Sequence, residues 1–464
     1  MENSNTPLPS PAERLARLFG DREYFTNVSR LAWPIIIQQF MFAMLNMTGV
    51  VFIGQLGETS VAAVTLAGQI NFLLNLIHFG IISGAAMFTA QFWGKGDLPN
   101  LRRVLGICLM LALSTSLLLF FLSQLFPEQI LGLYSNEAEV LALGREYVKI
   151  YSWTFPFVGI SFSYAYVMRS TGDVKTPTYI GAGALILSTI LSYALIFGKF
   201  GLPNLGIEGA AVSALIARVL ECAILLTVAY ARKSPVAASL RELFDLDRVF
   251  IARILRPMMP VILNELFWSL GITTYIAIYG RMGQGALAAI NITSSIEQVA
   301  IVLFIGLANA TAVLVGNRIG DGKEEEAYRY AGNSLRLGAV GGILMGLLIQ
   351  LVKSPILSLY NFSPAALNEI SMLLNVASIF LWVRVNNMAI VVGILRAGGD
   401  TKYSLFLDGF IIWMVGVPLT ALGALFFHLP VHWVLVCAMA EEATKWVLGI
   451  RRYRSRKWIN NLAH

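Results

Sequence analysis

Twelve stretches of this chain are almost entirely apolar, and each is about 20 residues long. A helix of that length crosses the bilayer's hydrocarbon core, because an α-helix rises about 1.5 Å per residue. With 57% hydrophobic and only 13% charged residues, the chain lies outside the range of soluble globular domains. The sequence therefore predicts an all-α integral membrane protein with twelve transmembrane helices. They are expected near residues 31–53, 61–88, 104–126, 148–168, 179–197, 210–230, 257–279, 286–315, 334–352, 372–395, 405–427 and 431–450.

Most of the 34 lysines and arginines fall in the N-terminal segment, the even-numbered connections and the C-terminal tail. By the positive-inside rule this side is cytoplasmic, so both termini are predicted to lie in the cytoplasm. The net charge of +7 then reflects topology, and we expect a lipid bilayer and no nucleic acid as the partner. The predicted location is the cell's inner (cytoplasmic) membrane, as a multi-pass protein.

Two turns have nearly the same sequence, RSTGDVK at 169–175 and RAGGDTK at 396–402. The same offset of 226 or 227 residues also aligns Pro34 with Pro260, GQLG at 54–57 with GRMG at 280–283, and Gly94 with Gly320. We infer two homologous six-helix bundles. Because six is even, both halves enter the membrane in the same direction, which predicts a pseudo-twofold axis along the membrane normal. In the turns, glycine permits a positive φ and aspartate caps the turn.

The repeat divides the chain into predicted parts. They are a cytoplasmic N-terminal segment (1–30), an N-lobe with spans 1–6 (31–230), a charged cytoplasmic linker (231–256), a C-lobe with spans 7–12 (257–450) and a basic cytoplasmic tail (451–464). We expect the linker to be partly helical.

Together these motifs resemble the multidrug and toxic compound extrusion (MATE) transporters. The resemblance rests on a proline early in spans 1 and 7, the GQLG-type turns, QFWGKGD and GNRIGDGK after spans 2 and 8, and LRAGGDTK after span 10. It covers roughly residues 25–458. It implies secondary active export of amphipathic, often cationic organic compounds in exchange for Na⁺ or H⁺, with no other cofactor.

Charges within hydrocarbon are costly unless they are paired or hydrated, so charged residues inside spans are functional candidates. Arg218 with Glu221, and Lys445 with Glu441 or Glu442, have the i, i+3 or i, i+4 spacing of local ion pairs. Four further charged residues have no such neighbour in the sequence: Glu265, Glu297, Arg384 and Asp408.

These four residues, together with Asn264, Asn386 and Asn387, are the predicted cation-coupling site. Counting about 1.5 Å per residue places them at similar depths, about 8–17 Å from one membrane face. A carboxylate whose pKa is raised by burial suits proton coupling, whereas a cage of carboxylate and amide oxygens suits Na⁺. Arg384 can occupy the place of the cation when the site is empty. Alternatively, Glu265 and Glu297 pair with Arg384 only to stabilise the C-lobe.

The chain departs from the family pattern at this site. The sodium-coupled branches carry an acidic residue in span 7, which Glu265 resembles, but they place it about one turn later, where this chain has Trp268. Another branch has an aspartate in span 1, where this chain has Gln38, Gln39 and Asn46. Both coupling ions therefore remain open.

A polar stripe in the first half predicts a substrate cavity. Asn71, Asn75 and His78 recur at helical spacing along span 2, and Gln39 and Asn46 lie on one side of span 1. With Trp268, these residues are the predicted substrate contacts; the alternative is that they form hydrogen bonds between helices.

Other function classes find little support. The chain has no G-x-x-x-x-G-K-[ST] nucleotide motif, no HExxH and no GxSxG, so we expect neither an ATP-driven pump nor an enzyme. His428 and His432 have metal-ligand spacing without Cys, Asp or Glu nearby, so no metal site is predicted. The main alternative is a flippase for lipid-linked oligosaccharides or lipids. We expect a monomer that acts on small organic molecules.

Overall fold

A computed structural model describes residues 22–135, 137–358 and 363–463, with the side chain of Asn46 excepted. Throughout this part the chain forms helices joined by turns, so the predicted all-helical architecture is confirmed. The described residues form two compact units. The N-unit contains residues 34–267 and the chain's end from Leu462; the C-unit contains residues 22–33 and 268–461.

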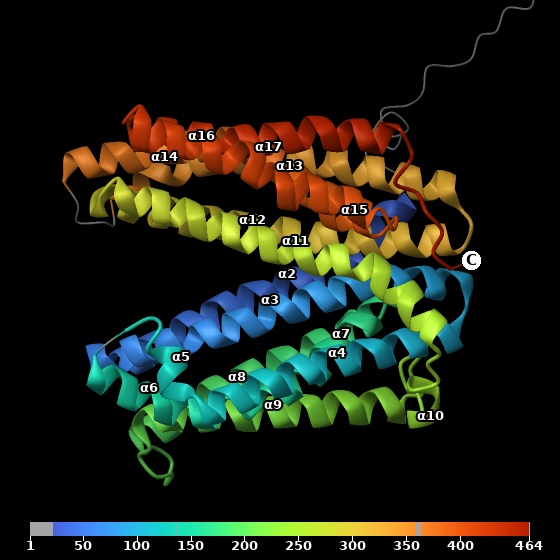
Figure 1. Cartoon of the computed structure of the whole chain (residues 1–464), viewed down its shortest axis with the longest axis horizontal. Coiled ribbons are helices and arrows are strands. Elements are labelled where there is room, and N and C mark those ends of the chain that lie inside the picture. The colour runs from blue at the N-terminus through green and yellow to red at the C-terminus, as the bar shows by residue number, and fades with distance from the viewer. Residues whose placement is uncertain (1–21, 136, 359–362, 464) are drawn as a thin grey trace, which may run out of the picture. The chain divides into compact units, whose positions relative to one another are not determined.

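The N-unit is a helical bundle in which α8 packs along α9, and α4 packs against α3 and α7 (Figure 1). Its core includes Phe88 and Phe92 from α3, Leu105 from α4 and Met168 from α7. The helices wholly within it are α3 (Glu58–Lys95), α4 (Leu98–Leu125), α5 (Pro127–Leu131), α6 (Ala138–Tyr151), α7 (Thr154–Ser170), α8 (Lys175–Phe197), α9 (Gly206–Ala231) and α10 (Leu240–Leu243).

In the C-unit, α13 packs along α14, and α14 also contacts α12 and α17. Several segments wind as π-helices, which are frequent at functional sites. The elements wholly within this unit are α12 (Gln284–Gly320), α13 (Glu324–Leu357), α14 (Pro364–Met388), η1 (Ala389–Arg396), α15 (Thr401–Ser404), η2 (Leu405–Phe410), η3 (Ile412–Gly416), α16 (Val417–Ala421), η4 (Leu422–Phe426) and α17 (Val431–Arg454).

Two long helices, α2 (Arg22–Gly54) and α11 (Arg248–Arg281), each contribute to both units. The division falls between Trp33 and Pro34 in α2 and between Phe267 and Trp268 in α11. Both helices contain internal prolines, which remove a backbone hydrogen bond. The first part of α2 therefore belongs to the C-unit, and the first part of α11 belongs to the N-unit. The predicted lobe boundaries, which followed the sequence repeat, stay predictions.

Ten helical segments of the described chain are long and apolar enough to cross a membrane. They correspond to ten of the twelve predicted spans. The fourth predicted span is divided between α6 and α7 by a turn at Ser152 and Trp153, and α7 has only 17 residues. The twelfth is α17, whose apolar character is interrupted by Glu441, Glu442 and Lys445.

The repeated turns share one backbone conformation. At three pairs of equivalent positions the glycine adopts a positive φ, which a residue with a side chain rarely does. The paired φ values are 108° and 115° for Gly57 and Gly283, 79° and 76° for Gly96 and Gly322, and 89° and 76° for Gly172 and Gly399. The similarity of the two halves therefore extends to their turn geometry, where glycine is the residue that fits.

Candidate functional site

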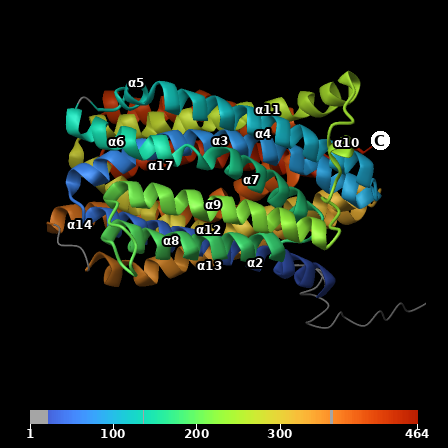
Figure 2. The same ribbon diagram turned by 90° about the horizontal axis from the view of Figure 1, so that it is seen from below.

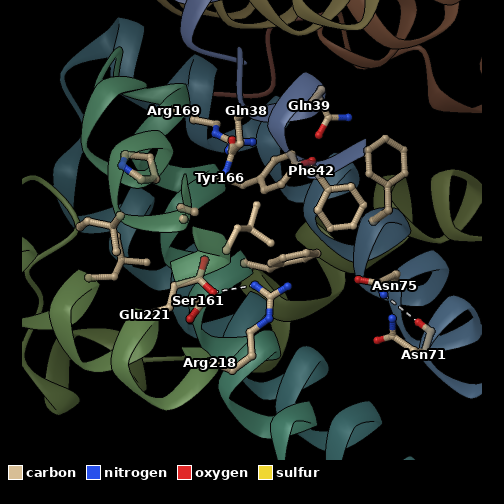
Figure 3. Close-up of a pocket in the computed structure, with 18 of the residues that line it drawn as sticks. Gln38, Gln39, Phe42, Asn71, Asn75, Ser161, Tyr166, Arg169, Arg218 and Glu221 are labelled. Carbon is tan, nitrogen blue, oxygen red and sulfur yellow. Dashed lines mark hydrogen bonds and ion pairs between the residues drawn. The ribbon is translucent and has the colours of Figure 1, made fainter. Parts of the chain in front are cut away.

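The N-unit contains a partly open cavity of about 450 Å³ between side chains of α2, α3, α7, α8 and α9 (Figure 3; the same helices are seen from another side in Figure 2). Part of its wall is aromatic and aliphatic, and part is polar. The polar lining residues are Gln38, Gln39, Asn71, Asn75, Ser161, Tyr166, Arg169, Arg218 and Glu221.

Three charged residues line this cavity. On α9, Arg218 Nη1 donates to Glu221 Oε2 at 2.6 Å, which confirms the predicted i, i+3 pair. Arg169, in the last turn of α7, donates from Nη2 to Gln38 Oε1 at 2.6 Å. Its guanidinium also lies 4.9 Å from the ring centroid of Tyr166. The formal charge of the lining is therefore +1.

The predicted substrate contacts have different positions. Gln39, Asn71 and Asn75 line the cavity. His78 does not line it, because it is fully buried with Nε2 3.1 Å from Ser116 Oγ and 3.2 Å from the Ala112 carbonyl oxygen of α4. Trp268 belongs to the C-unit. The Asn46 side chain lies outside the described part of the structure.

A cluster of charged side chains lies inside the C-unit. Arg384 Nη1 on α14 lies 2.7 Å from both carboxylate oxygens of Glu297 on α12. Its Nε is 3.8 Å from Glu442 Oε1 on α17. Asn387, one turn after Arg384, donates from Nδ2 to Glu442 Oε2 at 2.7 Å and to the Glu442 backbone oxygen at 2.8 Å. Three helices are thus connected by one guanidinium and one amide.

The cluster continues around a buried ammonium group. Lys445 is only 2% exposed, and its Nζ lies 2.8 Å from Asp408 Oδ1 of η2. Lys445 also forms an ion pair with Glu441, as its i, i+4 spacing predicted. The Tyr275 hydroxyl on α11 donates to the same Glu441 carboxylate. Because Glu441 and Glu442 are adjacent in α17, both groups of contacts belong to one cluster.

This C-unit cluster has more carboxylates than cations. Its members are four acidic residues, Glu297, Asp408, Glu441 and Glu442, and two basic residues, Arg384 and Lys445, so its formal charge is −2. Asn387 belongs to the cluster through Glu442, and its Oδ1 accepts no hydrogen bond from the described residues. Asn386 is also buried and its Oδ1 also has no partner there, but this oxygen faces α13, where a Cβ atom at Gly338 would lie 3.4 Å from it. Excess negative charge with an unused amide oxygen is an arrangement suited to a small cation.

Glu265 and Asn264 are buried and belong to the N-unit, although both were predicted as coupling residues of the C-lobe. The side chain of Glu265 lies next to Gly80 of α3, where a Cβ atom would be 3.6 Å from Glu265 Cγ. The sequence repeat placed all of span 7 in the C-lobe, whereas the first part of α11, which carries both residues, belongs to the N-unit.

Sequence reasoning assigned Glu441, Glu442 and Lys445 to local ion pairs, and it did not identify Tyr275 or Arg169. Glu441, Glu442 and Lys445 could have been identified as site residues, because charged side chains within an apolar span are rare and often functional. Arg169 lies in a repeated turn, which explained its presence without reference to a cavity. No local pattern points to Tyr275.

Comparison with known proteins gives matches along nearly the whole chain. The MatE family model matches twice, over residues 34–194 and 260–422, beginning at the two prolines that align the repeats. The uncharacterized transporter YisQ of Bacillus subtilis (strain 168) is 24% identical over 462 residues, covering 98% of this chain and 97% of YisQ. The probable multidrug resistance protein YoeA of the same organism is 26% identical over 426 residues, covering 90% and 89%.

The fold is also similar to a solved structure. A mutant of the Vibrio cholerae MATE transporter VcmN superposes with a TM-score of 0.86 at 19% identity, covering 95% of this chain and 98% of VcmN. At this identity the likeness establishes the fold.

Proposed function

The chain belongs to the MATE family of transporters, and from that premise we propose that it exports amphipathic organic compounds, cations included, in exchange for Na⁺ or H⁺. Membership makes it a multi-pass membrane transporter rather than an enzyme. The name of YoeA, a probable multidrug resistance protein, supports drug-like substrates. We also retain the proposals of two six-helix lobes (31–230 and 257–450), cytoplasmic termini and a location in the inner membrane.

The observation that supports ion coupling is the C-unit cluster, with its formal charge of −2. Buried charge of one sign is costly, so such a cluster favours uptake of a cation. A proton neutralises one carboxylate directly. Sodium needs oxygen ligands, which the carboxylates and Oδ1 of Asn387 supply. Asn386 stays proposed as a coupling residue on the basis of the sequence, because its Oδ1 faces α13.

Within this proposal, Arg384 competes with the cation. Its guanidinium now contacts Glu297 and lies near Glu442, so it occupies the negative region of the cluster. A cation that binds these carboxylates weakens their attraction for Arg384 and shifts the balance toward another side-chain arrangement. Asp408 participates through Lys445. Asn264 and Glu265 stay proposed as coupling residues on the basis of the sequence alone.

The test is transport by the full chain in proteoliposomes, with a cationic and a zwitterionic fluorescent dye each offered as substrate. A Na⁺ gradient and a pH gradient are imposed separately on the wild type, Glu297→Gln and Glu442→Gln. We expect one gradient to drive the wild type and both variants to lose at least about tenfold in rate. Glu58→Gln, an exposed residue in the first turn of α3, is the matched control and should transport normally.

Glu442→Gln is expected to fold, because a glutamine can still accept the hydrogen bond from Asn387. A loss of transport in this variant is then not explained by misfolding. Normal transport by folded Glu297→Gln and Glu442→Gln contradicts the site assignment. If neither gradient moves either dye in the wild type, a flippase acting on another cargo becomes the function to test.

A further inference from the structure

We propose that Arg169 and Gln38 bind a carboxylate on the transported molecule, so that the N-unit cavity selects amphipathic compounds carrying an anionic group, zwitterions included. This inference rests on the proposed function as a transporter of amphipathic compounds and narrows its substrate class. The family resemblance implied cargo that is often cationic, and three of the four charged candidates without a near neighbour in the sequence are acidic. Glu297 and Asp408 belong to the C-unit cluster, and Glu265 does not line the cavity. The lining of the cavity has a formal charge of +1.

The first argument is charge. Arg218 and Glu221 neutralise each other at 2.6 Å, which leaves Arg169 as the excess charge of the lining. Arg169 donates to the neutral Gln38 amide and lies against the Tyr166 ring, and no ion pair joins it to a carboxylate among the described residues. A guanidinium at the end of a membrane helix is stabilised by an anion. A ligand carboxylate in the cavity supplies one.

The second argument is the set of hydrogen-bond donors. A guanidinium has five N–H groups in a planar fork that fits a carboxylate. Arg169 Nε has no partner among the described residues. Gln38 Oε1 accepts from Arg169, so the Gln38 amide nitrogen is directed elsewhere, toward Gly181, where a Cβ atom would lie 2.8 Å from it and 3.3 Å from Glu221 Oε1. Gln38 and Gly181 both line the cavity, and no side chain at Gly181 stands between this second donor and a ligand. Because Glu221 is already paired with Arg218, the donor is left for the ligand carboxylate.

The third argument is the shape of the remaining wall. The aromatic rings of Phe42, Phe72, Phe79 and Phe162 line the cavity together with aliphatic residues. Its volume of about 450 Å³ lies within the range of pockets that hold drug-sized molecules. The ligand is therefore expected to combine an apolar or aromatic body with one carboxylate, and not to be a simple inorganic anion.

The experiment compares two dyes that differ in one group. One is a zwitterionic rhodamine with a free carboxylate, and the other is its methyl ester, which is a cation. Their affinities for the purified full chain are measured by fluorescence anisotropy at equilibrium. We expect the wild type to bind the free acid at least about tenfold more tightly than the ester, because the ester has no negative charge and cannot form a bidentate ion pair with the guanidinium.

Two variants remove this preference by different routes. Arg169→Gln deletes the charge, and Gln38→Glu places a carboxylate beside Arg169 that competes with the ligand. Each is expected to bring the ratio of the two affinities to about one. Gln38→Glu keeps the arginine and gains an ion pair, so it folds even if Arg169→Gln does not. Arg145→Gln, the same change at an exposed arginine of α6, should retain the wild-type ratio.

Equal affinity of the wild type for the two dyes, tighter binding of the ester, or no measurable binding of either overturns the proposal. A preference that survives in folded Gln38→Glu also overturns it. The measurement uses no ion gradient, so a failure of the proposed coupling mechanism leaves its outcome unaffected. Conversely, gradient-driven export of the ester without a preference for the acid refutes this inference and leaves the proposed function intact.

Discussion

Arg384 and Glu297 are 87 residues apart in the chain, yet Arg384 Nη1 lies 2.7 Å from both oxygens of the Glu297 carboxylate. The contact joins α14 to α12 inside the C-unit. Arg384 also lies near Glu442, so one guanidinium serves two carboxylates. This relationship has two interpretations, a structural ion pair and a coupling site, which the next prediction separates.

We expect Glu297→Gln to destabilise the protein by about 3 kcal/mol, because it leaves Arg384 with the more distant Glu442 alone. The double variant Glu297→Gln with Arg384→Gln should recover most of this loss, since a neutral pair replaces the ionic one. Thermal unfolding measures the stability, and the proteoliposome assay measures transport. Recovery of stability without recovery of transport supports a coupling role. Recovery of both shows that the pair is structural.

Lys445 neutralises Asp408 and Glu441 from a position that is 2% exposed. Lys445→Met is therefore expected to cost about 3–5 kcal/mol, because two buried carboxylates lose their cation. Adding Asp408→Asn removes one of the two unpaired charges and should restore part of the stability. The yield of monodisperse protein and its thermal unfolding report both effects. A Lys445→Met variant as stable as the wild type contradicts the ion pairing in the structure.

Gly398, in the second of the repeated turns, packs directly on Trp458 of the C-terminal tail, which is fully buried. A Cβ atom there would overlap the Trp458 backbone and ring. We expect Gly398→Val to cost about 1–3 kcal/mol and to detach the tail, which trypsin then cleaves faster at Arg456 and Lys457. Thr171→Val changes the equivalent position of the first turn and should leave the cleavage rate unchanged. Equal rates in both variants contradict the prediction.

The segment that precedes α11 is attached to α4 by an ion pair. Asp247 Oδ2 lies 2.7 Å from Arg103 Nη2, and Oδ1 accepts from the Phe250 backbone N–H at 2.7 Å. The Phe250 N–H, and next Arg103, lower the pKa of Asp247 below its usual value. A lowered folded-state pKa means that the stabilisation is present above the unfolded value of about 3.9 and is lost as the pH falls through the folded value.

We therefore expect this segment to become susceptible to proteolysis and hydrogen exchange as the pH drops below about 4. Asp247→Asn should be less protected than the wild type at neutral pH and should show a smaller change with pH. Hydrogen exchange followed by mass spectrometry of residues 240–250, from pH 7 to pH 3, measures both. Identical pH profiles for the variant and the wild type refute the assignment to Asp247.

The sequence alone determined the features that depend on neighbours along one helix or turn. Apolar runs located the helices, because length and composition decide which segments can cross a bilayer. Helical spacing identified the Arg218–Glu221 and Lys445–Glu441 pairs, because residues three or four apart always share a helix face. The repeated glycines predicted the turns, because few other residues adopt a positive φ.

Only the tertiary structure decided which helices bring their polar groups together. The contacts of Glu297 with Arg384 and of Asp408 with Lys445 depend on how separate helices are rotated and packed. The same holds for Arg169, which the sequence placed in a turn and the structure places on a cavity wall. Helix rotation is set by the fit of many apolar side chains at once, and membrane helices are apolar on nearly every face, so their sequence pattern does not specify it.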